Sequence, residues 1–234
     1  MNVKSLLSLF NGGSKEQAGT PFGSALTVHE VDHMIARGMG RHLIVGAEST
    51  GLVGGGAGTV PDNDQPELAI GVPEGYAIKV IRIGAQIEAG LAAADNDENE
   101  VYFGVDTRGT LQGPLSAETC VIENPTNMRT DLGYGSACQC ASAFSADMQI
   151  KPKYAAAADP VLDIELCRAV ERVDITTAAG MFLQRLDLVY EPRHSLLLVG
   201  PCTLLGYWGG TVATVGGFAQ VSWVEGRVEE FFHR

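Results

Sequence analysis

The alternation of hydrophobic and polar positions predicts strands along most of the chain after residue 60. The segment YAIKVIRIGAQIE, residues 76–88, predicts one long strand with a β-bulge near Val80, because its apolar phase shifts there. The first half would then place its apolar residues on one face and the second half on the other, which are Tyr76, Ile78 and Val80 against Ile81, Ile83, Ala85 and Ile87. The segment EVYFGVD, residues 100–106, alternates without a break. Turn clusters rich in Gly, Pro, Asn and Asp separate further strand candidates, which are 115–122, 143–150, 161–166, 182–190, 195–199, 211–215 and 218–232.

The N-terminal residues follow a helical period instead. A short helix is predicted whose apolar stripe, at offsets 0, 3, 4 and 7, consists of Val3, Leu6, Leu7 and Phe10. A glycine-bearing strap follows, and a second helix is predicted over 27–37, with Thr27 as N-cap and Glu30 three residues later. Residues 163–173, DIELCRAVERV, fit either a helix or a strand followed by a turn.

Together these patterns predict an all-β fold. Eight or nine antiparallel strands fit a two-sheet sandwich best, and the single jelly roll is the commonest sandwich at this size. We therefore expect two parts, an N-terminal arm with short helices and a Gly-rich strap over residues 1–60 and a jelly-roll β-sandwich domain over 61–234.

The stretch HEVDHM, residues 29–34, contains the His-Glu-x-x-His spelling of many zinc proteases. In that reading His29 and His33 would bind zinc, Glu30 would activate a water, and Glu48 is an available third ligand. However, Glu30 already completes a capping box with Thr27, and the third histidine of the elongated zincin form is missing. A surface helix explains the motif better, so no metal site is expected here.

Charge and cysteine content limit the partners. The formal net charge is −12 with no cluster of Lys and Arg at either end, which argues against nucleic-acid binding. Two acidic runs, 62–67 and 95–100, are typical of solvated loops; a calcium site is the alternative, although neither run has EF-hand spacing. Five cysteines cannot all pair within one chain, so we expect buried free thiols made in a reducing cytoplasm.

The sequence holds little that indicates a reaction. Metal-binding jelly rolls of the cupin kind cluster histidines on neighbouring strands, whereas the strand region contains only His194. No Gly-x-Ser-x-Gly elbow, phosphate loop or dinucleotide fingerprint occurs. The residues after Met1 include a short apolar stretch without a convincing cleavage site, so no signal peptide is expected. We therefore expect neither an enzyme nor a bound cofactor.

Two segments resemble parts of a known family. SLLLVGPCTLLGYWGGTVATVGGFAQVSWVEGRVEEFF resembles the last strands of viral single jelly-roll capsid proteins, in which a hairpin of small residues precedes a long final strand. LAIGVPEGYAIKVIRIGAQIE is similar to their first core strand. The likeness covers about half of the chain and implies a virion shell subunit, made in the host cytoplasm, that assembles with copies of itself.

The missing basic arm departs from capsid proteins that package single-stranded genomes. It favours the family members from double-stranded DNA viruses with an internal membrane, some of which combine two different capsid subunits. The stripe of Val3, Leu6, Leu7 and Phe10 would then contact a neighbouring subunit, because Lys4 is the only cation available to attract anionic lipid. The rival hypothesis is a carbohydrate- or ligand-binding sandwich, in which Tyr207 and Trp208 would form an exposed aromatic platform, although packing in the core or in an interface explains this pair better.

Overall fold

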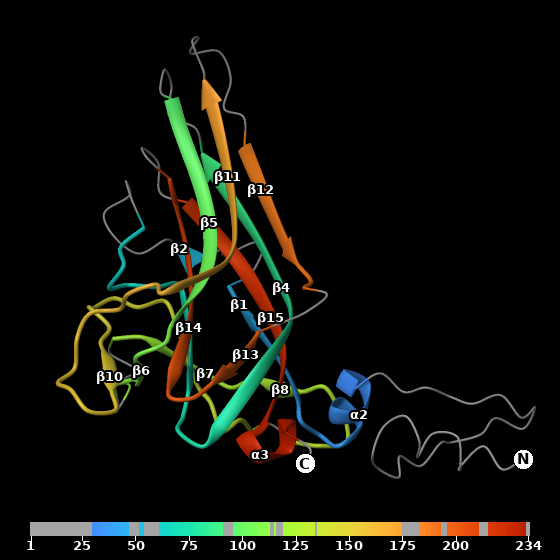
Figure 1. Cartoon of the computed structure of the whole chain (residues 1–234). Coiled ribbons are helices and arrows are strands. Elements are labelled where there is room, and N and C mark those ends of the chain that lie inside the picture. The colour runs from blue at the N-terminus through green and yellow to red at the C-terminus, as the bar shows by residue number, and fades with distance from the viewer. Residues whose placement is uncertain are drawn as a thin grey trace, which may run out of the picture.

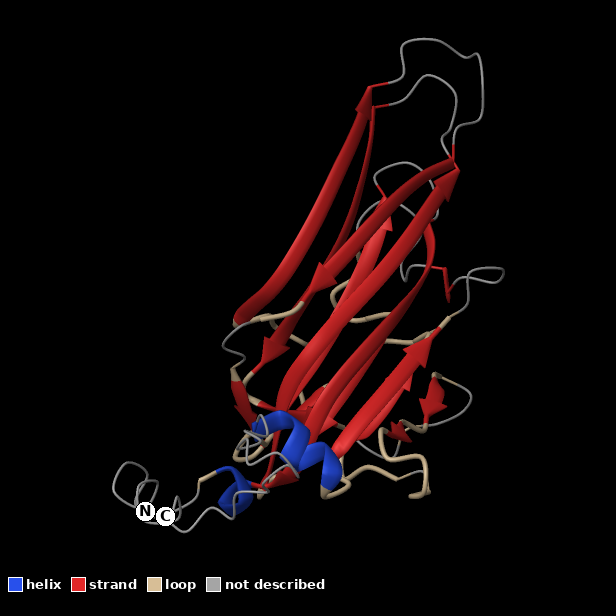
Figure 2. Ribbon diagram, turned by 90° about the vertical axis from the view of Figure 1, so that its right-hand side faces the viewer, coloured by secondary structure: helices blue, strands red, loops and turns tan. Residues whose placement is uncertain are grey.

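The computed structural model consists of two stacked antiparallel sheets (Figure 1). It describes residues 30–46, 52–53, 61–90, 96–112, 115, 119–133, 135–174, 183–192, 196–210 and 215–232. The long strands run lengthwise, with the two helices at one end of the sandwich (Figure 2). The prediction of an all-β antiparallel sandwich is thereby confirmed.

The larger sheet has seven strands. Its order is β12 (Leu183–Tyr190), β4 (Tyr76–Gly90), β15 (Val215–Arg227), β1 (Gly40–Val45) and β8 (Thr126–Asn127), with β13 (Leu197–Val199) beside β4 and β2 (Leu52–Val53) beside β15. The six-stranded sheet has the order β11 (Ile164–Asp174), β5 (Asn96–Asp106), β14 (Cys202–Gly210), β3 (Leu68–Val72), β9 (Gln139–Ser142) and β7 (Val121–Glu123). A small sheet pairs β6 (Gly109–Leu111) with β10 (Ile150–Pro152).

Four antiparallel strand pairs, each within one sheet, are nested along the chain. Strand β3 pairs with β14, β4 with β12, β5 with β11, and β6 with β10. The strands β10 to β14 thus pair with the strands β3 to β6 in reverse order along the chain. The chain from β3 to β14 therefore follows the path of one long hairpin, in which three pairs lie in the two main sheets and the fourth, β6 with β10, forms the small sheet.

Strand β4 contains the predicted bulge. Its register against β15 jumps from Arg82 opposite Ser222 to Val80 opposite Trp223, which leaves Ile81 as the extra residue. The expectation that the two halves of the strand face opposite sides is wrong, because the bulge cancels the phase shift. Both halves pack into the core between the sheets, through Tyr76, Ile78, Val80, Ile83, Ala85 and Ile87. Ile81 packs outside the sandwich, in the cluster beneath the helices.

The outer face of the six-stranded sheet is covered by the chain between β5 and β11. Residues of β3, β5 and β14 that point away from the sandwich core meet side chains from this segment in a second apolar cluster, which includes Tyr102, Leu205 and Tyr207 from the strands and Phe144, Met148 and Ile150 from the segment. The strands predicted over 115–122 and 143–150 are largely wrong, because among their described residues only 121–122 and 150 lie in strands. Phe144, Met148 and Ile150 instead belong to the cover.

Strand β14 was not predicted, although it lies in the centre of a sheet. Its residues are buried on both sides, with Leu204 and Trp208 facing the sandwich core and Leu205 and Tyr207 facing the outer cluster. Such a strand has no hydrophobic alternation to detect. The predicted hairpin of small residues is also absent in the described part, because β14 and β15 belong to different sheets. The ambiguous segment 163–173 is the edge strand β11.

Helix α2 (Glu30–Ala36) matches the second predicted helix, while Thr27 lies outside the described residues. It packs on the outer face of the seven-stranded sheet, where Met34, Met39 and Val224 are buried beside α3 (Val228–Phe231). Val3, Leu6, Leu7 and Phe10 also lie outside the described residues. Strands β1 and β2 fall within the predicted arm, 1–60, yet both pair with β15, so the sandwich begins before residue 61.

The cysteines suggest a direct test of the core. Cys120, Cys138, Cys140 and Cys202 are buried free thiols and Cys167 is half-buried. Burial raises the pKa of the Cys167 and Cys202 thiols to about 12. Since the thiolate is the reactive form, we expect all five to react slowly with Ellman's reagent at pH 8 in the native protein. All five should react at once in guanidinium without reductant. A native thiol that reacts within seconds would contradict this packing.

Candidate functional site

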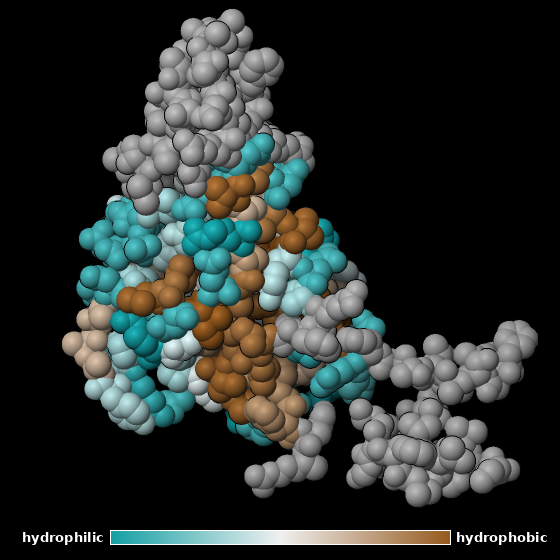
Figure 3. All heavy atoms as spheres, turned by 45° about the horizontal axis from the view of Figure 1, so that its top comes forward, coloured by the Kyte–Doolittle hydropathy of each residue, from teal (hydrophilic) through white to brown (hydrophobic). Residues whose placement is uncertain are grey.

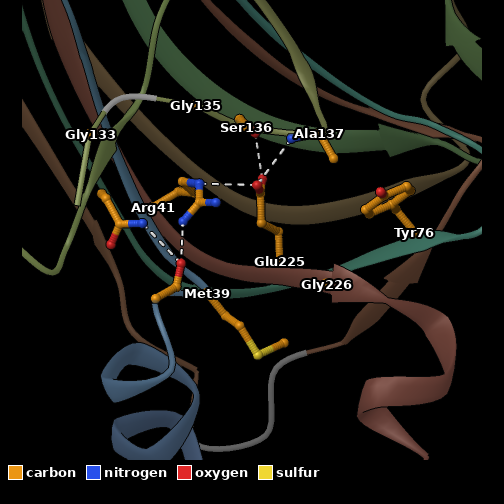
Figure 4. Close-up of a pocket in the computed structure, with 11 residues that line it drawn as sticks. Met39, Arg41, Tyr76, Gly133, Gly135, Ser136, Ala137, Glu225 and Gly226 are labelled. Carbon is orange, nitrogen blue, oxygen red and sulfur yellow. Dashed lines mark hydrogen bonds and ion pairs between the residues drawn. The ribbon is translucent and has the colours of Figure 1, made fainter.

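A cavity of about 390 Å³ lies at the end of the sandwich that carries the helices. Its walls come from the turn between α2 and β1, the end of β15, and the segment that leads into β9 (Figure 4). The lining residues are Gly38, Met39, Arg41, Tyr76, Asn127, Gly133, Gly135, Ser136, Ala137, Glu225 and Gly226. Within the described residues, this cavity is the strongest candidate for a binding site.

A buried ion pair forms the centre of the cavity. The Arg41 Nε atom lies 3.0 Å from Glu225 Oε1, and the side chains are 14% and 4% exposed. The two side chains point toward one another from neighbouring strands (Figure 4). The guanidinium also donates through Nη1 to the carbonyl oxygens of Gly38, at 2.7 Å, and Gly40, at 3.0 Å. Arg41 thereby fastens the turn after α2 to strand β15.

The carboxylate of Glu225 fastens a second segment. Its Oε1 accepts the backbone N–H of Ala137 at 3.1 Å, and its Oε2 accepts the Ser136 hydroxyl and, at 3.1 Å, the Trp223 indole N–H. The Ser136 oxygen in turn accepts the N–H of Cys138 at 3.0 Å. One buried carboxylate therefore holds the entry to β9, in the six-stranded sheet, against β15 in the other sheet.

Local backbone geometry completes the wall. Gly38 has φ +81°, a conformation in which helices commonly end at glycine. A Cβ atom at this position would lie 2.4 Å from Leu132 Cδ1, so a side chain would also collide with the turn opposite. Asn127 Nδ2 donates to the Gly38 oxygen at 2.9 Å, which ties strand β8 to the same turn. The Gly38 carbonyl oxygen thus accepts hydrogen bonds from both Asn127 and Arg41.

This arrangement stabilises the fold and offers little for catalysis. The two opposite charges compensate one another at 3.0 Å, although the Arg41 Nε–H makes no well-aligned hydrogen bond. The Ser136 hydroxyl points to a carboxylate that already accepts the Ala137 and Trp223 N–H groups. Burial, and then the charge of Glu225, raise the pKa of the Cys138 and Cys140 thiols well above the ordinary value, so neither is a reactive thiolate. A small polar molecule could occupy the cavity, but no nucleophile stands beside a free base there.

A second candidate site is the contact between His42 and Ser222, on the outer face of the seven-stranded sheet. The His42 Nδ1 atom is 2.8 Å from the Ser222 hydroxyl oxygen. Burial, and then the positive charge of Arg82, lower the pKa of His42 below its ordinary value. A catalytic serine–histidine pair needs a third group that orients and stabilises the protonated ring. An arginine beside the ring does the opposite, so this pair is a poor candidate for catalysis.

The zinc motif lies partly outside the described residues. His29 falls there, Glu30 opens α2, and Glu30 and His33 are both exposed. Over the ranges that are described, no group of three or more His, Cys, Asp or Glu side chains is placed to hold a metal ion.

The acidic loop 62–67 has internal roles. Asp62 Oδ1 accepts the N–H of Asp64 at 3.0 Å, and Glu67, which is buried, accepts the N–H of Trp208 at 3.0 Å. Burial, and then the nearby carboxylates of Asp159, Asp62 and Asp147, raise the pKa of Asp64. In the second acidic run, 95–100, Glu100 forms an ion pair with Arg168 at 2.6 Å. Calcium was the alternative to a solvated loop at these runs, and among their described residues no three acidic side chains are placed to hold a metal ion.

The aromatic platform of the rival hypothesis is wrong and the core packing favoured for this pair is confirmed, because Tyr207 and Trp208 are buried, at 1% and 0% exposure. Trp208 lies in the core between the sheets. Tyr207 stacks on Tyr102 with ring centroids 5.1 Å apart, and the guanidinium of Arg168 covers the Tyr102 ring at 4.3 Å. The two residues follow one another along a strand, so their rings point to opposite faces, and each face is covered.

The Arg41–Glu225 pair was not predicted from the sequence. The alternation in VSWVEGR could have indicated that Glu225 is buried, because Glu225 continues the series of Val221 and Trp223 on the core face. A charged residue in a buried phase indicates a paired charge, but its partner lies far away in the chain.

Comparison with protein-family models, curated proteins and solved structures finds no significant match. No helix in the described part of the chain is long and apolar enough to cross a membrane.

Proposed function

We propose that this protein is a structural subunit that assembles with copies of itself into an icosahedral virion shell. The observation that carries the proposal is the nested pairing of β3 with β14, β4 with β12, β5 with β11 and β6 with β10. Rolling one antiparallel hairpin into two sheets nests strand pairs in this way, so the pairing supports a single jelly-roll winding. Viral capsid, lectin and cupin domains use that winding.

The side chains favour the first of these three classes. A cupin needs clustered histidines on its strands, whereas the histidine on β1, His42, contacts a serine and lies near an arginine. The aromatic platform of the carbohydrate-binding alternative would need exposed rings at Tyr207 and Trp208, whereas both are buried. Because a fold does not by itself define a function, a carbohydrate- or ligand-binding module remains the alternative.

Electron microscopy of the purified full chain tests the proposal. Shells, capsomers or ordered sheets in negative stain are the expected result, together with a concentration-dependent sedimentation coefficient. A protein that remains a monodisperse monomer at every concentration and binds glycans would replace the proposal with the alternative. If the purified chain forms capsomers but no closed shell, completing the shell would require a further component, such as a second capsid protein or an adjoining membrane.

The N-terminal stripe is proposed to contact a neighbouring subunit. Burying Val3, Leu6, Leu7 and Phe10 would contribute roughly 1.5 to 3 kcal/mol each, which is enough to fasten an arm to another copy. Deleting residues 1–12 is therefore expected to block assembly while leaving the melting temperature of the isolated subunit nearly unchanged. Lys4→Ala, which leaves the stripe intact, is the matched control and should assemble normally. Normal assembly of the truncated chain, or a large loss of monomer stability, would contradict this role.

A further inference from the structure

The cavity beside the Arg41–Glu225 pair has the size of a small-ligand site. Its volume of about 390 Å³ falls within the roughly 300 to 1,000 Å³ that is typical of such sites. Its chemistry differs from that of the apolar band that Figure 3 shows on the surface of the sandwich, because the cavity wall includes charged and hydrogen-bonding side chains. The cavity is therefore suited to a polar ligand.

The hydrogen-bond acceptors of the wall are largely occupied. Both carboxylate oxygens of Glu225 accept hydrogen bonds from protein donors, and the side chain is only 4% exposed. The Gly38 carbonyl oxygen accepts hydrogen bonds from two side chains. The Ser136 hydroxyl donates to the carboxylate and accepts the N–H of Cys138. A ligand in the cavity would thus find few acceptors for its own donors.

Several donors of the wall, in contrast, have hydrogen atoms to spare. The Arg41 guanidinium carries five N–H groups, of which the two on Nη1 bond backbone carbonyl oxygens and the one on Nε faces Glu225 without a well-aligned hydrogen bond. Among the described residues, neither the Nη2 group of Arg41 nor the Tyr76 hydroxyl has a hydrogen-bond partner. Asn127 Nδ2 uses one of its two N–H groups on Gly38. The ligand must therefore supply acceptors.

The wall carries no net charge. Among the described lining residues, Arg41 is the one cation and Glu225 the one anion, and the two compensate one another at 3.0 Å. An anionic ligand at the guanidinium would be repelled by the carboxylate beside it, and a cationic ligand at the carboxylate would be repelled by the guanidinium. An uncharged ligand meets neither penalty.

The free donors are spread over three strands. Arg41 lies on β1, Asn127 on the neighbouring strand β8, and Tyr76 at the start of β4, which β15 separates from β1. Figure 4 shows Tyr76 on the opposite side of Glu225 from Arg41. Because β1 and β4 are two strand spacings apart, about 10 Å, a ligand that bonds donors on both sides needs acceptors at several points. Hydroxyl oxygens around a sugar ring have this arrangement.

We propose that this cavity binds a neutral sugar, whose hydroxyl oxygens accept hydrogen bonds from Arg41 Nη2, Asn127 Nδ2 and the Tyr76 hydroxyl. Met39 supplies an apolar part of the wall, against which the C–H groups of the ring can pack. Sugar binding at this end of the sandwich is a function in addition to assembly, because it neither requires a shell nor opposes one.

Saturation-transfer difference NMR on the full chain tests the site, since it detects binding to a free subunit as well as to an assembly. The probes are glucose, galactose, mannose and N-acetylglucosamine, each titrated separately. Saturable binding of at least one of them is the expected result, and an excess of inorganic phosphate should not displace the sugar. If none of the four binds saturably, or if phosphate displaces the sugar, the inference is wrong.

Tyr76→Phe locates the binding. The substitution removes a hydroxyl that bonds no described residue and retains the ring that packs on the core, so the melting temperature should stay close to that of the wild type. The dissociation constant of the sugar should rise about threefold to tenfold, the effect of one lost hydrogen bond. Tyr154→Ala is the control, because it removes a ring that is 89% exposed and outside the cavity, and it should bind as the wild type does.

The outcomes separate this inference from the proposed function. Unchanged binding by Tyr76→Phe, or lost binding by Tyr154→Ala, would place the sugar elsewhere and overturn the inference, whether or not the chain assembles. A chain that forms shells but binds no sugar keeps the proposed function and loses this site. A chain that stays monomeric, yet binds sugar more weakly after Tyr76→Phe, keeps this site and loses the shell.

Discussion

Glu225→Ala is expected to lower the free energy of unfolding by about 3 to 5 kcal/mol, the cost of leaving one partner of a buried ion pair alone. The substitution would leave Arg41, which is 14% exposed, without its carboxylate. It would also remove the acceptor for Ser136, the Ala137 N–H and the Trp223 indole. Urea denaturation followed by tryptophan fluorescence measures the change.

Two further variants identify the cause. Glu225→Gln retains a side-chain acceptor oxygen but removes the charge, so its loss should be smaller than that of the alanine variant. Glu191→Ala removes the carboxylate of the exposed pair with Arg82, whose side chains are 61% and 46% exposed, and should cost less than about 1 kcal/mol. If Glu225→Ala costs no more than Glu191→Ala, the Glu225 carboxylate does not hold the entry to β9 against β15 as described.

Trp208→Ala is expected to destabilise the protein by about 3 to 5 kcal/mol, as large-to-small substitutions of buried aromatic residues do. The side chain is completely buried in the core between the sheets, so its removal leaves a cavity that the surrounding strands can fill only in part. Thermal unfolding by circular dichroism and urea denaturation should agree on the loss.

The neighbouring tyrosine provides the control. Tyr207 donates its hydroxyl to the Asn63 carbonyl oxygen at 2.8 Å, so Tyr207→Phe should cost about 1 kcal/mol, the net value of one hydrogen bond. Tyr154→Ala, at a residue that is almost fully exposed, should have no measurable effect. A folded Trp208→Ala variant with wild-type stability would mean that Trp208 lies at the surface, and would revive the aromatic platform.

Strands with one buried face and one more polar face were predictable from the sequence. The segment 76–88 belongs to β4, and even its bulge is readable, because an inserted residue shifts the apolar phase at Val80. The edge strand β12 matches the predicted 182–190 almost residue for residue. Helix α2 was predicted from local signals and is present over Glu30–Ala36, whereas its proposed N-cap, Thr27, lies outside the described residues.

Only the tertiary structure decided which strands are buried on both faces and which polar side chains pair across long distances in the sequence. Strand β14 lacks alternation because the segment between β5 and β11 covers the outer face of its sheet, and no local pattern announces such a cover. The same cover buries Tyr207, so the aromatic pair could be read as a platform until its surroundings were known. Glu225 stands in a buried phase, but its partner, Arg41, is chosen by the register of β1 against β15. Local sequence determines which face of a strand is apolar, whereas the packing of distant segments determines which polar groups meet and which apolar faces remain open.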